Sequence, residues 1–452
     1  MTPPDRPPRR HRPAGRAAGP ARAVLAALGV AAVLALGLAV TGVVPVPALA
    51  GLAERPGGTP GAAPSPSAAE DPTPRPTPTP SPTPTPPPDV SFTVLAAGDV
   101  LLHEPVMASA RTPDGYDFRP LLAPVEPWVA GADLALCHLE VPVHPAGATP
   151  SGYPLFGAPP QIAASLAAGG WDGCSTASNH SVDRGVAGVA ATLEALDAAG
   201  LGHVGTARTP EEAAAPQLYD VVREGRTVRV AHLAATYGTN GVPVPADAPW
   251  TVTLLDTASI VAQASAARAA GADLVLASIH CCVEYVSEPT PEQTALAAEL
   301  AASGVVDLVI GHHAHVPQTI ARLPGGPRGE GMWVAYGLGN LVSNQDGDCC
   351  TPRTDSGLLL TATVRQPADG PASVVGVDWT AVTVDRFGGH RVLPASAAVA
   401  AGQGAGTLDA ATLATRRARV VEVVGAEAPE RTVAPTPTGP APVVVMRPAP
   451  TP

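Results

Sequence analysis

Short apolar runs that end in polar side chains constrain the fold of this chain more than any other feature of its sequence. Runs over 92–97, 133–139, 173–177, 227–235, 273–279, 305–310 and 333–336 have the length and composition of buried strands. Helix-like stretches over 186–199 and 291–302 follow two of them, and the second begins with a proline, which suits a first helical turn. Two further strands are expected over 357–364 and 373–384. This alternation predicts an α/β fold.

The N-terminal part of the 452-residue chain has the composition of a targeting segment. Residues 1–22 form an Arg-rich leader, and residues 23–50 carry no charge and are mostly Leu, Val and Ala. An apolar run of this length after a basic leader favours a membrane anchor with the N-terminus inside. The sequence Ala48-Leu49-Ala50 instead fits a signal-peptide cleavage site. Under both alternatives we expect the rest of the chain outside the cytoplasm.

Proline-rich segments flank the part of the chain that can fold. Residues 51–89 are dominated by Pro-Thr and Pro-Ser repeats, and residues 425–452 repeat this pattern on a smaller scale. Such sequences bury too little apolar surface to form a core and favour extended conformations. We therefore expect a disordered linker with a reach on the order of 100 Å, a single folded domain over 90–424, and a disordered tail.

The charged residues exclude several classes of function. The formal net charge is -12, and every basic side chain apart from histidine is arginine. An acidic chain binds nucleic acid poorly, so no nucleic-acid partner is expected. The absence of lysine from the sequence excludes a P-loop and Schiff-base catalysis.

Side chains that can bind metal ions follow the predicted strands. They are Asp99, Glu140, Asn179, His280, His313 and His315. Open α/β sheets build their sites at such strand ends, and a mixture of carboxylate and imidazole ligands suits Mn, Fe or Zn. On an extended segment, His313 and His315 would share one face. Each residue also has a structural alternative, such as a turn former for Asp99 or a buried core histidine for His280.

Six cysteines in a chain that is expected to be exported favour disulfides. Adjacent cysteines are too constrained to pair easily with each other. We therefore expect a cross-link between the pairs Cys281-Cys282 and Cys349-Cys350, with zinc binding by the thiolates as the alternative.

An ordered set of motifs resembles the poly-γ-glutamate capsule-synthesis CapA family. The motifs are AGDVLLH at 97–103, HLE at 138–140, ASNHSVDRG at 177–185, His280 through Tyr285, GHHAHVPQ at 311–318 and YGLGN at 336–340. This family is similar to the calcineurin-like metallophosphoesterases, which implies a four-layer α/β/β/α sandwich. The resemblance implies a divalent metal site formed by Asp99, His103, Glu140, Asn179, His280, His313 and His315. It also implies that His180 and Asp183 handle protons beside the substrate.

The resemblance implies a function at the cell envelope. We expect an exported, membrane-tethered, metal-dependent hydrolase-like protein that acts on an amide or phosphoester of a poly-γ-glutamate-type polymer. Its partners would be this anionic polymer or its synthase, and the membrane through the N-terminal segment. The alternative is a non-catalytic component that binds or exports the polymer, and a divergent phosphatase of secreted phosphoesters is a third possibility.

Overall fold

The computed structural model describes residues 87–448. The predicted leader, the apolar segment and nearly all of the linker lie outside the described residues. Within the described part of the chain, no helix combines the length and the apolar composition that a membrane span requires.

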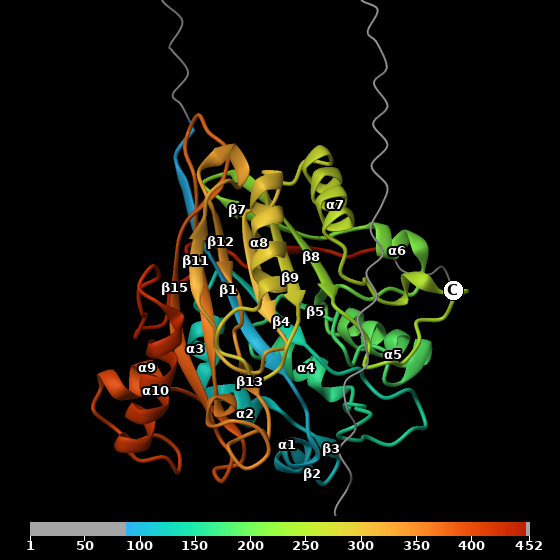
Figure 1. The fold of residues 1–452 in the computed structure, drawn as a ribbon, viewed down its shortest axis with the longest axis vertical. Coiled ribbons are helices and arrows are strands. Elements are labelled where there is room, and N and C mark those ends of the chain that lie inside the picture. Colours follow the sequence, from blue (N-terminus) through green and yellow to red (C-terminus); the bar gives the residue numbers. More distant parts are fainter. Residues whose placement is uncertain (1–86, 449–452) are drawn as a thin grey trace, which may run out of the picture. The chain divides into compact units, whose positions relative to one another are not determined.

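The first of two large sheets contains the first strand of the domain near its middle (Figure 1). Its order is β16-β15-β14-β1-β4-β5-β6, and β13 pairs with the end of β1. Strands β1, β4, β5 and β6 are parallel, whereas β14, β15 and β16 are antiparallel. The bounds are β1 (Val90–Val100), β4 (Leu134–Leu139), β5 (Gly173–Ser175), β6 (Gly202–Val204), β13 (Asn340–Val342), β14 (Ser356–Gln366), β15 (Ser373–Asp385) and β16 (Arg391–Pro394).

The second sheet has the order β11-β12-β10-β9-β8-β7-β17. Strands β8, β9, β10 and β12 are parallel, and antiparallel strands form both edges. The bounds are β7 (Gln217–Arg223), β8 (Arg226–Thr236), β9 (Leu274–His280), β10 (Leu308–His312), β11 (Ile320–Leu323), β12 (Met332–Ala335) and β17 (Val443–Val445). A separate hairpin joins β2 (Arg111–Thr112) to β3 (Gly115–Tyr116).

The two sheets pack face to face, and helices cover their outer faces. Alternate residues of a strand point to opposite faces, so Val94 of β1 faces Leu276 of β9 in the core between the sheets. Leu95 instead packs beneath α4 (Gln161–Ala168) and α5 (Gly185–Ala198), and Val275 packs beneath α7 (Thr257–Ala269) and α8 (Pro291–Ser303). The layers are therefore helix, sheet, sheet and helix, and the predicted α/β class is confirmed.

The remaining helices are mostly short. They are α1 (Glu104–Ser109), α2 (Arg119–Leu122), α3 (Glu126–Val129), α6 (Pro210–Ala214), α9 (Ala395–Ala400) and α10 (Ala410–Val424). Helix α10 begins at the N-cap Asp409, whose carboxylate accepts a hydrogen bond from the Thr412 amide. Its residues Leu413, Val420 and Val424 enter the core between the sheets beside β14 and β15.

The prediction of a disordered tail is wrong for residues 425–448. Strand β17 extends the second sheet by pairing with β7, and the buried Arg447 donates hydrogen bonds to the backbone carbonyls of His203, Thr206 and Ala215. A proline-rich segment cannot form a core of its own, but it can lie on a folded domain through backbone pairing and anchored side chains such as Arg431, which pairs with Asp378, and Arg447.

The predicted cross-link between the two cysteine pairs is also wrong. Cys137 and Cys174 are register partners on β4 and β5 and form one disulfide, with Cα atoms 4.4 Å apart. Cys281 pairs with Cys282, and Cys349 with Cys350. Cys281 is buried in the core beside α7 and α8, whereas Cys349 is exposed, which keeps the two pairs apart.

Candidate metal centre

The carboxyl ends of the parallel strands in both sheets bring metal-binding side chains together. Asp99 near the end of β1 is the register partner of His138 on β4, and His280 on β9 is the register partner of His312 on β10. A ring-nitrogen contact of 3.0 Å between His138 Nε2 and His280 Nδ1 joins the sheets at this point. The site therefore follows from the shared direction of these strands.

Asp99 is the centre of the first group of ligand atoms. One of its carboxylate oxygens lies 3.1 Å from His315 Nδ1, and the other lies 3.3 Å from His312 Nδ1. The opposite nitrogen of His315 lies 3.7 Å from Glu140 and 3.9 Å from Glu284. Two sets of ligand atoms, from Asp99, Glu140 and His315 and from Glu284, His313 and His315, each lie within 4.8 Å of one another.

A second group lies beside the first. His280 Nε2 is 2.9 Å from the amide oxygen of Asn179, and the ring centroids of His280 and His313 are 4.7 Å apart. The Asn179 oxygen and His280 Nε2, which are 2.9 Å apart, are close enough to bind the same metal ion.

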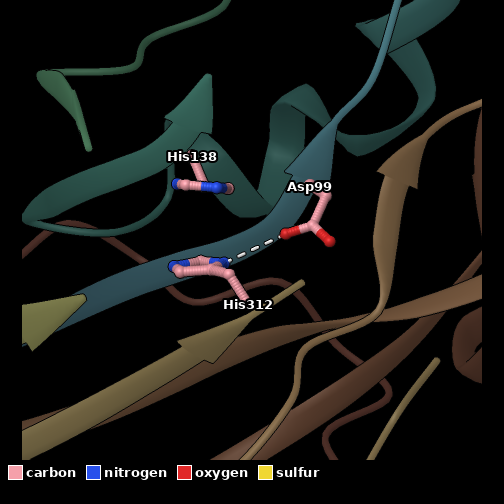
Figure 2. Close-up of side chains that lie close together, drawn as sticks. All are labelled: Asp99, His138 and His312. Carbon is pink, nitrogen blue, oxygen red and sulfur yellow. Dashed lines mark ion pairs between the residues drawn. The ribbon is translucent and has the colours of Figure 1, made fainter. Parts of the chain in front are cut away.

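Two imidazole rings are stacked beside Asp99 (Figure 2). The rings of His138 and His312 have centroids 3.9 Å apart and planes 16° apart, and His312 also forms the ion pair with Asp99. Both rings are buried.

Burial gives this site an unusual distribution of protons. It raises the pKa of Glu140 well above its ordinary value, with the nearby Asp99 adding to the effect. Burial opposes protonation of His315, but Glu140 and Asp99 outweigh it and raise the pKa of this residue to about 9. Burial, together with the neighbouring His315, lowers the pKa of His313 to about 3, so this ring is neutral at pH 7.

The unpaired donors and acceptors at this site fit a divalent cation. Both carboxylate oxygens of Glu140, one oxygen of Asp99 and Nδ1 of His313 are buried without a hydrogen-bond partner among the described residues. A buried carboxylate without a partner is costly, whereas neutral imidazoles and carboxylates together are the ligands of Mn, Fe and Zn.

A cavity of about 680 Å³ opens above this cluster. His315, Glu284 and His180 line its polar side, and Phe156 and Tyr285 belong to its aromatic wall. Residues of loops that follow strands of both sheets complete the lining: Leu101, His103, Tyr153, Pro154, Leu155, Asp183, Asn240, Val242, Asn344, Gln345, Cys349 and Cys350.

The predicted proton-handling pair lies at the edge of this cavity. His180 Nδ1 is 2.7 Å from Asp183 Oδ2, and the same oxygen accepts a hydrogen bond from the Phe156 amide. The other ring nitrogen of His180 lies 3.4 Å from the amide nitrogen of Asn240. The carboxylate therefore fixes the ring, and Nε2 lies beside Asn240 at the edge of the cavity.

The structure brings most of the predicted ligands together but not His103. Asp99, Glu140 and His315 lie in the first group, and Asn179, His280 and His313 lie in the second. His103 lines the cavity, accepts a hydrogen bond from the Asn344 amide and packs its ring edge-on to Phe156. It belongs to none of the close groups of ligand atoms found among the described residues.

The expected geometry of the histidine motif was wrong. His313 and His315 do not lie on an extended segment, because both have positive φ angles, of 84° and 55°, in a bend after β10. Their ring centroids are 6.0 Å apart. A strained bend, rather than strand alternation, turns both rings toward the carboxylates.

Four residues at the site were not among the predicted ones. They are His138, Asn240, Glu284 and His312. Two of them lie close to predicted ligands in the sequence, because His312 adjoins His313 and His138 lies two residues before Glu140, near the end of β4. Asn240 and Glu284 lie in irregular loops, where spacing gives no such signal.

Comparisons with known proteins agree with this arrangement of motifs. Residues 93–345 match the family model described as bacterial capsule synthesis protein PGA_cap. A capsule biosynthesis protein CapA from Bacillus anthracis is 29% identical over 37% of this chain and 39% of its own length. A probable polyglutamine synthesis accessory protein from Mycobacterium tuberculosis is 31% identical over 44% of this chain and 52% of its own.

Two further matches complete the comparison. The PGA biosynthesis protein CapA from Bacillus subtilis is 27% identical over 45% of this chain and 50% of its own. A 5'-nucleotidase precursor from Thermus thermophilus, a solved structure, aligns over 65% of this chain and 54% of its own with 17% identity and a TM-score of 0.40. The chain thus spans about half the length of the curated relatives or less. The matched family covers more than half of the chain, and the chain belongs to the bacterial capsule synthesis family of CapA-like proteins.

Proposed function

We propose that this chain is a metal-dependent hydrolase-like protein that acts outside the cytoplasm on a poly-γ-glutamate-type polymer of the cell envelope. The observation that carries the proposal is the group of buried, unpaired carboxylates and imidazoles at the foot of a cavity. The substrate class is taken from the relatives, whose names refer to capsule, PGA and polyglutamine synthesis. The location is taken from the basic leader and apolar segment in 1–50.

The metal would be held by side chains from both sheets. Asp99, Glu140 and His315 are one set of ligands, and Asn179, His280 and His313 are the other. A bound Mn, Fe or Zn ion supplies Lewis acidity that polarises a carbonyl or phosphoryl oxygen and activates water near neutral pH.

His180 provides the proton chemistry in this proposal. Asp183 accepts from its Nδ1, which orients the ring and leaves Nε2 at the cavity. A proton held at Nε2 can be donated to a departing amine or alkoxide. Asp183 stabilises the charged ring while it carries that proton, as in other carboxylate-oriented histidines.

The cavity suits a polymer segment with a neutral backbone and charged side groups. Its lining includes Tyr153, Leu155 and Phe156 but, among the described residues, no arginine. Apart from His315, whose pKa is raised to about 9, the positive charge that an anionic polymer requires would come from the bound cation, since a bound ion is the largest local charge in such a site.

The proposal is tested on the purified full-length chain in two steps. The metal content is first measured by mass spectrometry, and the metal-loaded protein is then incubated with poly-γ-glutamate and, separately, with a generic phosphodiester. We expect a bound transition metal and chain shortening of poly-γ-glutamate, both lost in His313→Ala. Binding of the polymer without cleavage of either compound would favour a non-catalytic export component, and full activity of His313→Ala would refute the metal mechanism.

A further inference from the structure

We propose that His138 is a positioning residue that fixes the orientation and the tautomer of His280 at the metal centre. This inference rests on the proposed function, because it takes His280 to be a metal ligand. No catalytic contact is assigned to His138, which is fully buried and does not line the cavity.

A continuous chain of hydrogen bonds joins Ser175, His138, His280 and Asn179. The Ser175 hydroxyl is 2.8 Å from His138 Nδ1, and His138 Nε2 is 3.0 Å from His280 Nδ1. His280 Nε2 then lies 2.9 Å from the amide oxygen of Asn179. The chain crosses from the first sheet to the second and ends at the donor atoms of the proposed second ligand group.

This chain can be satisfied in two directions. Without an ion, Ser175 donates to His138, His138 donates to His280, and His280 donates to the Asn179 oxygen. When His280 Nε2 binds an ion, its proton must lie on Nδ1, and it then donates to His138 Nε2. His138 in turn donates to the Ser175 hydroxyl. The two imidazole rings and the Ser175 hydroxyl can each donate one hydrogen bond and accept one. Reversing the direction of the chain therefore leaves no buried ring nitrogen without a partner.

His138 lies on the face of β4 that points into the core, where an apolar side chain is expected. Leu134 and Leu136 precede it on the same face of β4 and lie in the core between the sheets. A buried polar ring is costly unless it is hydrogen-bonded, and both nitrogens of His138 are. The ring also stacks on His312, which restricts its rotation.

The alternative is that Asp99, His138 and His312 hold an ion of their own, since their ligand atoms lie within 4.8 Å of one another. The ring stacking argues against it. An imidazole binds an ion in its own plane at about 2.0–2.1 Å. Two planes only 16° apart, with centroids separated by 3.9 Å, do not meet at that distance from both rings.

The test compares zinc binding by the full-length wild type with that of four variants. The number of ions per chain is counted by mass spectrometry, and the affinity is measured by competition with a chromophoric chelator. We expect His138→Phe, which keeps the stack on His312, to bind the same number of ions about 10–100-fold more weakly. His138→Gln can place its side-chain amide oxygen near the Nε2 position, where it accepts from His280 Nδ1–H, and should recover part of this loss. The mild variant Ser175→Ala should weaken binding to an intermediate extent.

His232→Phe is the matched control. His232 is a buried histidine on β8 that contacts the Ser278 hydroxyl at 2.8 Å and no proposed ligand. It should change the zinc affinity less than about twofold, because it tests only the loss of a buried imidazole. A ¹⁵N spectrum of the zinc-loaded protein should also place the His280 proton on Nδ1 in the wild type.

The outcomes separate the two levels of the argument. Unchanged zinc affinity in a folded His138→Phe and in Ser175→Ala would overturn the positioning role but not the metal centre. Loss of one ion per chain in His138→Phe, with the affinity of the remaining ions unchanged, would make His138 a ligand and also overturn the inference. A wild type that binds no zinc, manganese or iron would overturn the proposed function itself.

Discussion

Replacing Glu140 by glutamine should separate the effect of the cation from the stability of the domain. In the metal-free protein both Glu140 oxygens are buried without a partner among the described residues, and its pKa is raised by burial. A buried polar group without a hydrogen-bond partner costs about 1–3 kcal/mol. Glu140→Gln should therefore leave the metal-free protein at least as stable as the wild type.

The response to metal should change in the opposite sense. A ligand that binds only the folded state at 100 times its Kd stabilises it by about 2.7 kcal/mol. At about 2 °C per kcal/mol for a domain of this size, the wild-type Tm should rise by roughly 5 °C. Without the Glu140 charge the rise should fall below about 1 °C. Differential scanning fluorimetry with and without Zn²⁺ or Mn²⁺ measures both quantities.

Glu212→Gln is the matched control for this prediction. Glu212 is equally buried but is paired with Arg208, away from the proposed ligands. Removal of one partner of a buried ion pair costs about 3–5 kcal/mol, so this variant should lower the Tm of both forms and keep the rise with metal. The reasoning about Glu140 is refuted if Glu140→Gln keeps the full rise, or if it destabilises the metal-free protein as Glu212→Gln does.

Three further changes have defined outcomes. A methyl group at Gly311 would collide with the Tyr336 carbonyl, so Gly311→Ala should displace the end of β10, cost about 1–3 kcal/mol in urea unfolding and weaken zinc binding. Asp183→Asn removes the carboxylate that orients His180 and should slow hydrolysis by about 10²–10⁴-fold while zinc affinity stays the same. Burial raises the pKa of Asp172 to about 7, so the folded state holds a proton that the unfolded state releases. The wild-type protein should therefore lose stability relative to Asp172→Asn as the pH rises from about 5 to 7, by at most about 1.4 kcal/mol per pH unit. Urea titrations of both proteins at several pH values measure this difference.

The strands and the longer helices of the core could be predicted because burial dictates their composition. The apolar run over 273–279 became β9 (Leu274–His280), and the proline-started stretch over 291–302 became α8 (Pro291–Ser303). Helix α7 was missed because it is short of large apolar residues and buries mainly alanines and one isoleucine. Strand β7 was missed because Gln217, Asp220 and Arg223 leave it without a continuous apolar run.

The residues of the metal centre could be predicted from their places at strand ends, but their geometry could not. The positive φ angles of His313 and His315 depend on the packing of the bend, which no local pattern encodes. His103 was expected among the ligands from its motif, yet helix α1 begins directly after it and its ring turns to Phe156. The tail was misjudged because backbone pairing of β17 with β7 requires no apolar composition.

The position of β1 has a consequence for how the chain acquires its structure. Its neighbours in the sheet are β4, which follows soon after it, and β14, whose Val364 carbonyl accepts from the Ser91 hydroxyl 273 positions away in the chain. Contacts between such distant parts of a sequence form slowly, since the intervening loop must close first. A fragment that ends where the family match ends, at residue 345, would leave one edge of β1 without its antiparallel neighbour. The region beyond the shared family segment is thus part of the same cooperative folding unit, and synthesis of nearly the whole polypeptide must precede completion of the sheet that carries Asp99.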